Sequence, residues 1–214
     1  NRRFADAVLD EVAGEPAIVF LQDYHLGLAA RFLKDQRPDL QVAQFWHVPW
    51  PNAEVFRIFP WRHELLQGLL ANDLLGFHLR ANALNFLDSV ADSLEALVNR
   101  ERLAVDRAGH RTWARHFPMG IHADEIAAMA ESIEAREAEE RIRKRLALDG
   151  CKVLLGVDRM DYTKGIPERL EALERLFVKH PEWRGKLAFI QIAVPSRAEV
   201  PEYREAQERV RAWV

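Results

Sequence analysis

Short apolar runs alternate along the chain with longer segments whose apolar residues recur at helical spacing. The runs contain no charged residue, which is typical of strands that are buried on both faces of a parallel sheet. The pattern predicts strands at residues 17–21, 42–46, 74–77, 153–157 and 187–193. It predicts helices at residues 26–36, 54–59, 61–70, 80–99 and 122–148, and from residues 167 and 202 onward. Strands separated by helices indicate βαβ units, and so an α/β fold with parallel sheets.

Two segments depart from this alternation. Residues 103–105 and 112–117 flank a turn that contains Gly109, and they predict a β-hairpin. The helical stretch at residues 122–148 has few large apolar residues, which is typical of a helix that bridges two domains. We therefore predict a domain boundary near residue 122.

Composition excludes several classes of protein. The formal net charge of −3 and the mixing of basic with acidic residues give no support for nucleic-acid binding. The single cysteine, Cys151, excludes an intramolecular disulfide and a cysteine-rich metal site. No apolar stretch approaches the roughly 20 residues that cross a bilayer, and no signal peptide or initiator Met is visible. We expect a cytoplasmic protein, and we expect this chain to be a piece of a longer one.

Sequence motifs narrow the chemistry further. The chain has no dinucleotide-binding fingerprint, no P-loop, no H-E-x-x-H zinc motif and no G-x-S-x-G nucleophile elbow. We therefore expect neither a cofactor nor a metal ion.

Polar residues follow three of the predicted strands. In open parallel sheets, ligands bind outside the carboxyl ends of the strands. Asp23 follows the first strand, His47 the second and His78 the third. The carboxylate of Asp23 could accept hydrogen bonds from sugar hydroxyls, or it could cap the next helix. A lone histidine more often has a structural role, so the pattern alone leaves both alternatives open.

The fourth strand is followed by the most specific segment, residues 158–167. It presents Arg159 and Lys164 just before a helix that begins near Pro167. Two cations beside a helix N-terminus form an anion site suited to a diphosphate. The alternative is that Arg159 forms only a surface ion pair with a neighbouring aspartate, which contributes at most about 1 kcal/mol.

Taken together, these segments resemble the trehalose-6-phosphate synthase family of retaining glucosyltransferases. The matching strings occur in the family's order and cover nearly the whole chain: Asp23–Leu26, His47–Pro51, Glu54–Arg57, Leu75–His78, Asn85–Leu87, Phe117–Ile121, Asp158–Arg169, Gln191–Ala193 and Pro195–Arg197. The resemblance implies a GT-B fold of two Rossmann-like domains. Residues 1–122 would be the C-terminal portion of the N-terminal, acceptor-side domain. Residues 123–214 would be a linker helix and the first part of the C-terminal domain, which binds the nucleotide-sugar donor.

The resemblance also implies roles for individual residues. Arg159 and Lys164 match the basic pair that holds the donor diphosphate, and His47 matches the histidine over the reacting donor glucose. We expect these three residues to be catalytic. Asp23 matches the carboxylate that binds acceptor-sugar hydroxyls, and Arg197 matches an arginine that grips the acceptor's phosphate.

One position departs from the commonest pattern of the family. His78, a candidate contact of the sugar or the donor, stands where the trehalose-forming branch often has Gln. A related branch that glucosylates glycerol 3-phosphate has His there. The resemblance implies glucose transfer from a nucleotide diphosphate to glucose 6-phosphate, which forms trehalose 6-phosphate with retention. The alternatives are glucosylglycerol-phosphate synthesis and a non-catalytic, regulatory homologue that binds sugar phosphates.

Other parts of the family's site are expected outside this chain. The glycine-rich loop and the aromatic acceptor contacts would precede Asn1, and the acidic segment that binds the ribose and the donor glucose would follow Val214. We therefore expect the chain alone to be inactive. The sequence leaves open the donor base (uridine, guanosine or adenosine) and whether the protein is a homo-oligomer. Neither nucleic acid nor a membrane is expected as a partner.

Overall fold

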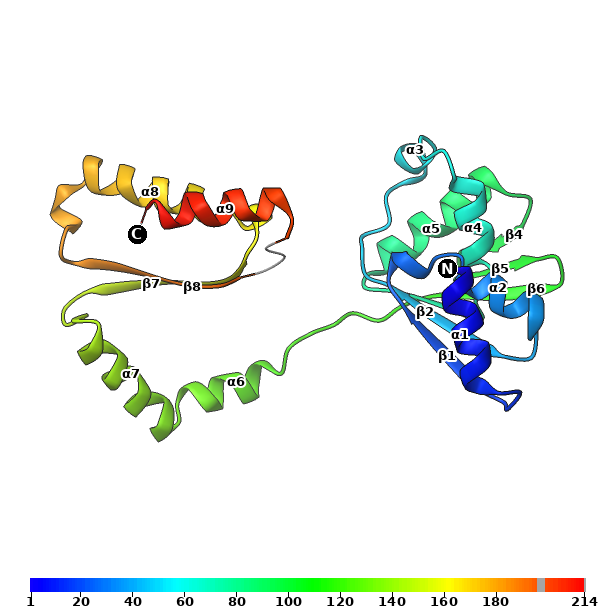
Figure 1. Cartoon of the computed structure of the whole chain (residues 1–214), viewed down its shortest axis with the longest axis horizontal. Helices are drawn as coiled ribbons and strands as arrows, with labels where there is room; N and C mark the ends of the chain where they lie inside the picture. Colours follow the sequence, from blue (N-terminus) through cyan, green and yellow to red (C-terminus); the bar gives the residue numbers. More distant parts are fainter. Residues whose placement is uncertain (196–198, 214) are drawn as a thin grey trace. The chain divides into compact units, whose positions relative to one another are not determined.

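The computed structural model describes residues 1–195 and 199–213 of the chain. The chain divides into two units, Asn1–Ile121 and His122–Val214 (Figure 1). We call them the first unit and the second unit and describe each by itself. Among the described residues, no helix has both the length and the apolar character that crossing a membrane requires.

The first unit, all of whose residues are described, contains a six-stranded sheet with the order β1-β2-β3-β6-β5-β4. The strands are β1 Ile18–Gln22, β2 Gln41–Trp46, β3 Leu74–Phe77, β4 Leu97–Asn99, β5 Ala104–Arg107 and β6 His110–His116. The first four strands in the sheet order run parallel, whereas β5 and β4 are added antiparallel. Helices connect the parallel strands, so the predicted α/β fold with a parallel sheet is confirmed.

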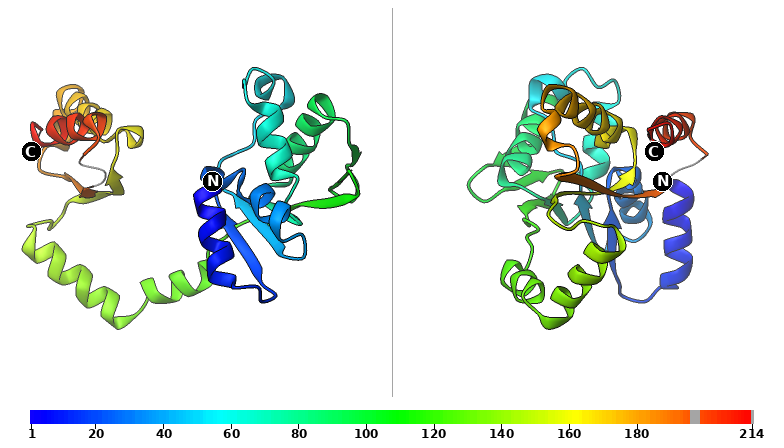
Figure 2. Two further views of the ribbon diagram at one scale, coloured as in Figure 1. Left: turned by 45° about the vertical axis from the view of Figure 1, so that its right-hand side comes forward. Right: turned by 90° about the vertical axis from the view of Figure 1, so that its left-hand side faces the viewer.

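Helices pack against this sheet over two apolar clusters. They are α1 Arg2–Val12, α2 Ala29–Gln36, α3 Ala53–Phe56, α4 Arg62–Leu69 and α5 Arg80–Ser93, with a 3-10 turn η1 at Tyr24–Leu26. Helices α1 and α2 lie beside β1 and β2, where Leu21 and Leu33 are fully buried (Figure 2). Helices α4 and α5 enclose the second cluster, which includes Trp50 and Phe86. These two clusters hold the strands that carry the candidate site.

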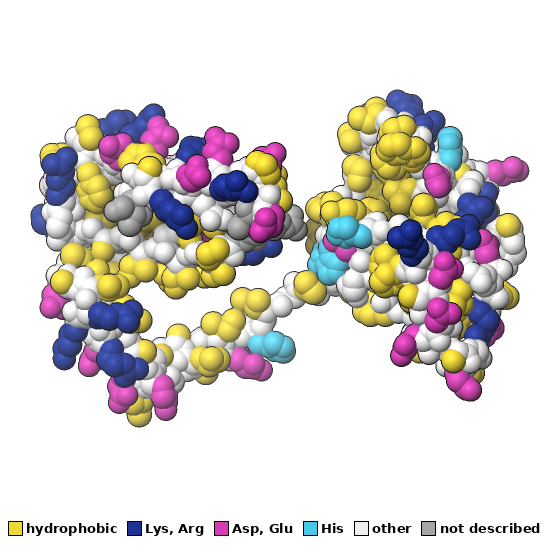
Figure 3. Space-filling view, viewed as in Figure 1, with side chains coloured by type: hydrophobic (Ala, Val, Ile, Leu, Met, Phe, Trp, Pro, Cys, Tyr) yellow, Lys and Arg dark blue, Asp and Glu magenta, His cyan; other side chains and the backbone are white. Residues whose placement is uncertain are grey.

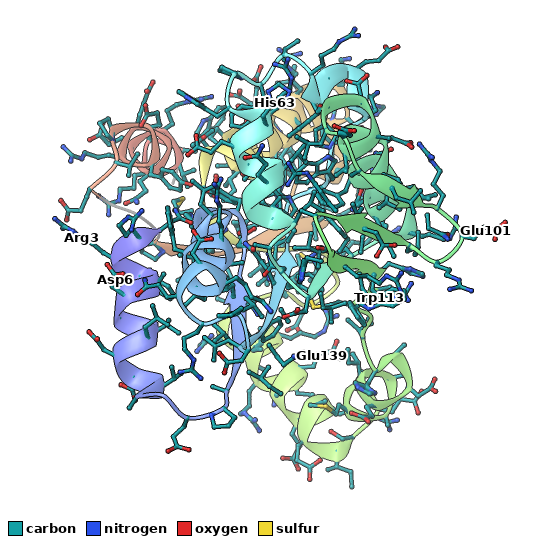
Figure 4. All side chains as sticks on the ribbon, turned by 90° about the vertical axis from the view of Figure 1, so that its right-hand side faces the viewer. Arg3, Asp6, His63, Glu101, Trp113 and Glu139 are labelled. Carbon is teal, nitrogen blue, oxygen red and sulfur yellow. The ribbon has the colours of Figure 1, made fainter. Side chains whose placement is uncertain are left out.

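The predicted hairpin is confirmed, and its turn has a clear physical cause. Strands β5 and β6 are joined by Ala108 and Gly109, which both have positive φ values, 49° and 78°. Two consecutive positive φ values define the tight turn that matches the twist of an antiparallel pair. Trp113 lies on β6 (labelled in Figure 4). The guanidinium groups of Arg111 and Arg115 lie 5.5 and 4.4 Å from the centroid of its ring.

The second unit contains one parallel strand pair among its described residues, β7 Lys152–Met160 and β8 Leu187–Pro195. Its helices are α6 Ala123–Ala130, α7 Ile133–Arg145, α8 Ile166–Lys179 and α9 Pro201–Arg211, with 3-10 turns η2 Tyr162–Lys164 and η3 Pro181–Trp183. Helix α8 connects the two strands as the crossover of a βαβ unit and lies against them with α9 (Figure 1). Both strands extend beyond the predicted apolar runs.

The single helix predicted at residues 80–99 is wrong in its second half. Helix α5 ends at Ser93, and the next residue, Leu94, is extended with φ −131° and ψ 148°. The following residues form β4, in which Val98 pairs with Val105 of β5. The apolar residues there fit either a helix or a strand, and pairing with β5 decides the outcome.

The single helix predicted at residues 122–148 is also wrong, because it is two helices. Helix α6 ends at Ala130 and α7 begins at Ile133. Between them, the hydroxyl of Ser132 accepts a hydrogen bond from the backbone N–H of Ala135 over 3.1 Å. This contact caps the first turn of α7, so the chain restarts a helix where the polar pattern suggested an uninterrupted one.

Candidate active site

Three of the predicted site residues meet at one edge of the sheet in the first unit. Strands β1, β2 and β3 are neighbours, and their carboxyl ends lie side by side, with Gln22 opposite Phe45 and Trp46 opposite Phe77. Asp23, His47 and His78 are the residues that directly follow these three strands. All three side chains are half-buried, so they are held by the fold and still open to solvent.

His47 is fixed on both of its sides by the end of β1. Its backbone N–H donates to Oδ1 of Asp23 over 3.2 Å, and its Nε2 lies 2.9 Å from the side-chain oxygen of Gln22. Since an amide oxygen only accepts, Nε2 carries the proton and Nδ1 is left as the acceptor of the neutral ring. The ring therefore has one orientation and one tautomer.

His78 stands next to His47. The centroids of the two imidazole rings are 5.3 Å apart in an edge-to-face arrangement, and the ring of Phe45 contacts both, at 4.7 and 4.9 Å. Histidine side chains gather beside a carboxylate on this unit in Figure 3. The second strand end and the third thus present a pair of imidazoles next to the carboxylate of Asp23.

Asp23 does not cap the 3-10 turn that follows it, because its side chain makes no capping hydrogen bond there. Its backbone has φ 64° and ψ 179°, a region that residues other than glycine almost never adopt. The conformation is held by the backbone of Phe45 and by the amide of Gln44, which donates to the Asp23 carbonyl over 2.9 Å. Residues held in strain of this kind cluster at functional sites. Among the described residues, Oδ2 of Asp23 has no partner and can accept a hydrogen bond from a ligand.

In the second unit, Asp161 shapes the loop that follows β7. Its carboxylate accepts from the backbone N–H of Thr163 at 2.9 Å, from the Thr163 hydroxyl at 2.8 Å and from the Tyr203 hydroxyl at 3.3 Å. The hydrogen bonds from Thr163 are the main reason why the pKa of Asp161 is lowered. The side chain is only 6% exposed. This buried anion fixes the 3-10 turn η2, which carries Lys164.

Arg159 and Lys164 both keep their charged ends exposed. The side chain of Arg159 is 59% exposed, and its Nη2 lies 4.0 Å from Oδ2 of Asp161, which is too far for a hydrogen bond. The surface ion pair considered from the sequence is therefore a loose one. Lys164 is exposed, and its ammonium forms no hydrogen bond or close ion pair among the described residues. Gly165, with φ 63°, then turns the chain into α8.

Arg169 ties this loop to both strands, and the sequence alone did not show it. Its Nη2 donates to the backbone carbonyl of Lys164 over 2.7 Å, and its Nη1 donates to Oδ2 of Asp158 over 2.8 Å and to the side-chain oxygen of Gln191 over 3.0 Å. Arg169 is also the main reason why the pKa of Asp158 is lowered. Gly156 leaves room for this network, because a Cβ there would clash with Gln191. Arg169 and Gln191 lie in the strings that match the family, but their contacts form only in the folded chain.

Arg197, expected to grip the acceptor's phosphate, lies outside the described residues. Within residues 1–195 and 199–213, no group of three or more His, Cys, Asp or Glu side chains is arranged to hold a metal ion.

The chain is similar to proteins of known family along its whole length. The model of glycosyltransferase family 20 matches residues 1–214. A trehalose-6-phosphate synthase of Mycobacterium sp. (strain KMS) is 41% identical over 100% of this chain and 45% of its own length. The crystal structure of a UDP-forming α,α-trehalose-phosphate synthase from Burkholderia xenovorans, in complex with glucose 6-phosphate, has a TM-score of 0.79 at 29% identity. It covers 99% of this chain and 47% of that one.

A second solved structure is about equally similar. The N-terminal domain of trehalose-6-phosphate phosphatase from Candida albicans has a TM-score of 0.74 at 29% identity, and covers 99% of this chain and 45% of that one. The chain spans less than half the length of the curated relatives that it matches. The family model and the relatives confirm the resemblance drawn from the sequence motifs: this chain belongs to glycosyltransferase family 20.

Proposed function

We propose that the protein containing this chain transfers glucose from a nucleotide diphosphate to glucose 6-phosphate and forms trehalose 6-phosphate with retention. The observation that carries the proposal is a pair of exposed cations before α8: Arg159 near the end of β7, and Lys164 on the turn η2 that Asp161 and Arg169 hold in place. Membership of a family of glycosyltransferases supports the same reaction type.

The charges of the second unit suit the departure of a diphosphate. As the bond between glucose and the diphosphate loosens, negative charge builds up on the leaving oxygen. A guanidinium that grips two oxygens, an ammonium and the N-terminus of α8 stabilise that charge without having to reorganise. Fixed donors of this kind contribute on the order of 3–4 kcal/mol each to the transition state.

The first unit supplies the groups that face the sugars. Oδ2 of Asp23 accepts a hydrogen bond from a hydroxyl group of the acceptor sugar. The fixed ring of His47 orients the donor glucose. The leaving phosphate takes the proton of the attacking hydroxyl, so His47 acts by position and is not an obligatory base. Arg197 holds the acceptor's phosphate in this proposal. Residues 1–122 belong to the acceptor-side domain, and residues 123–214 to the linker and the donor-side domain.

The names of the relatives favour uridine as the donor base and glucose 6-phosphate as the acceptor. The Burkholderia xenovorans relative is UDP-forming, and its structure was determined with glucose 6-phosphate. Glycerol 3-phosphate stays the alternative acceptor, because His78 stands where the related branch that glucosylates glycerol 3-phosphate has His. The experiment is a product assay of the intact protein with UDP-, GDP- and ADP-glucose against both acceptors. Trehalose 6-phosphate from UDP-glucose supports the proposal, and a product formed only from glycerol 3-phosphate overturns the choice of acceptor.

A regulatory protein is the second candidate, favoured by the likeness to the N-terminal domain of a phosphatase. Such a homologue would bind sugar phosphates without turnover. Calorimetry on the intact protein separates the two: binding of UDP-glucose and glucose 6-phosphate with no product in any combination would establish the regulatory function. The exposed Arg159 and Lys164 favour the enzyme, since a protein without turnover has no leaving group to stabilise. Inactivity of the chain alone and a cytoplasmic location stay predictions.

A further inference from the structure

A basic pocket lies at the edge of the sheet opposite the strand ends that carry Asp23, His47 and His78. It is formed by α2, by α4 with the residues that follow it, and by the β5–β6 turn, near the amino ends of β3 and β6. Its volume is about 560 Å³, which is within the range of small-molecule sites. Its polar lining consists of Arg31, Lys34, Asp35, Gln67, Arg107 and His110.

The pocket carries a net positive charge although the whole chain carries −3. Lys34 is already neutralised, because its ammonium lies 2.8 Å from the carboxylate of Asp73. Within the part of the chain that the structure describes, the polar contact of Arg31 is a long one, 3.4 Å to the Gln67 side chain. Arg31 and Arg107 therefore outweigh the single unpaired carboxylate of the lining, Asp35. A basic concavity on an acidic chain concentrates small anions.

Arg107 gives the strongest sign that a ligand belongs there. Its Nε is buried from solvent and has no hydrogen-bond partner, and its guanidinium forms no ion pair among the described residues. Because solvent does not reach Nε, a ligand in the pocket would contact the two Nη groups, which have no hydrogen-bond partner among the described residues either. An oxyanion beside Arg107 would accept from the guanidinium through two oxygens.

His110 narrows the chemistry of the ligand. Its Nε2 lies 3.0 Å from the backbone carbonyl of Asn72, so that nitrogen donates and the neutral ring keeps Nδ1 as an acceptor. A ligand that joins an oxyanion to hydroxyl groups would use both Arg107 and His110. Phosphate esters of sugars and polyols have this combination.

We propose that this pocket binds a small phosphorylated ligand, with its phosphate held by Arg107 and Arg31. The site is distinct from the strand ends of the proposed reaction, and the proposal does not depend on that reaction. A ligand here contacts α2, the β5–β6 turn and the segment that leads into β3. It is therefore placed to influence the strand that carries His78 from its opposite end.

The test uses the ¹⁵N-labelled 214-residue chain titrated with inorganic phosphate and, separately, with glucose 6-phosphate, at constant ionic strength against chloride. We expect saturable shifts of the amide signals of Arg107, Ala108 and His110. R107M keeps most of the aliphatic stem and removes the charge, and should weaken binding about tenfold or more. R31M, on an exposed position of α2, tests the same contact without touching the sheet. R136M, at an exposed residue of α7 with no ion pair, is the matched control and should leave the titration unchanged.

The outcomes separate this site from the proposed donor site. The double variant R159M/K164M should leave the shifts at residues 107–110 intact, whereas loss of those shifts in that variant would assign the anion to the donor loop and overturn the proposal. Equal shifts in chloride, or unchanged binding in both R107M and R31M, would also overturn it. Tighter binding of glucose 6-phosphate than of inorganic phosphate would show that the pocket also contacts the hydroxyl groups of the sugar. Equal affinity for glucose 6-phosphate and inorganic phosphate would show that the pocket recognises the phosphate group alone.

Discussion

Arg169 donates a hydrogen bond from Nη2 to the backbone carbonyl of Lys164 over 2.7 Å. The same guanidinium holds Asp158 on β7 and Gln191 on β8. One side chain therefore links the strand before the phosphate-binding turn, the neighbouring strand and the turn itself. Arg169 has no direct contact with a diphosphate in our proposal, and it acts by positioning Lys164.

We expect R169A to lower the turnover of the intact protein by roughly tenfold or more, because the hydrogen bonds of a charged donor are lost. R169K should recover little, since an ammonium cannot donate to all three partners in the plane that the guanidinium provides. The readout is kcat and KM for the donor, because a purely structural defect would reduce the amount of folded protein without changing the KM of what remains. R175A is the control on the same helix. Arg175 pairs with Glu171 on the exposed face and with no other described residue, so R175A should leave both constants unchanged.

Replacing Arg159 or Lys164 should lower the turnover of the intact protein more than replacing Arg169 does. We expect R159A and K164A each to reduce kcat about 10²–10³-fold, as measured for other prepositioned transition-state donors. K179A, at the exposed last residue of α8, serves as the charge-matched control. Near-normal turnover of R159A and K164A, with the control also active, would remove the basis of the proposed reaction.

Acid should destabilise the second unit through Asp158 and Asp161. The pKa of each carboxyl is lowered in the folded chain, that of Asp158 mainly by Arg169 and that of Asp161 mainly by Thr163. A lowered folded-state pKa stabilises the fold above the unfolded-state value and loses that contribution as the pH falls through the folded-state value. We therefore expect the contribution to be complete at neutral pH and to decline once the pH falls below the ordinary aspartate value of 3.8.

The measurement is the free energy of unfolding of the chain by urea between neutral pH and acid. In D158N the part of the pH dependence that comes from Asp158 should disappear, and the stability at neutral pH should fall. D149N, at an aspartate with no contact in the described structure, should reproduce the unmodified profile. A D158N profile as steep as the unmodified one would contradict the assignment.

The strained backbone of Asp23 predicts an unusual order of stabilities. Alanine at this position keeps the unfavourable φ of 64° and loses the hydrogen bond to His47, whereas glycine adopts that φ freely. We expect D23G to be more stable than D23A by about 1 kcal/mol or more in thermal unfolding of the chain. Both variants should raise the acceptor KM of the intact protein, since both lack the carboxylate. If D23A were the more stable of the two, the backbone at Asp23 would not be strained.

The sequence predicted strands best where a short apolar run ends at a polar residue. The strand at residues 74–77 was placed correctly, and so was its end before His78. The prediction failed at Ser132, where a capping hydroxyl divides a polar helical pattern, and at residues 97–99, where pairing with a distant strand decides the structure. Periodicity describes one segment at a time, and both features depend on contacts beyond it.

In the candidate site, too, the positions of residues could be predicted from the sequence, whereas the contacts between them could not. Strand order brought Asp23, His47 and His78 to one edge, but the hydrogen bond between Asp23 and His47 depends on a backbone conformation that no pattern of residue types predicts. Arg159 and Lys164 were predicted as two cations between a strand and a helix, but β7 extends to Met160, so Arg159 lies in the strand and only Lys164 is on the turn. The contacts that fix it come from Arg169 and from Gln191 on the next strand, and they appear only when both strands are in place.

The pairing of β7 with β8 sets a limit on how this region can change. Gly156 lies opposite Gln191 and Asp158 opposite Ala193, so the side chains that reach Arg169 depend on the alignment of the two strands. Adding or deleting one residue in β7 would turn Asp158 to the other face of the sheet. The number of residues between Gly156 and Lys164 therefore has to stay constant.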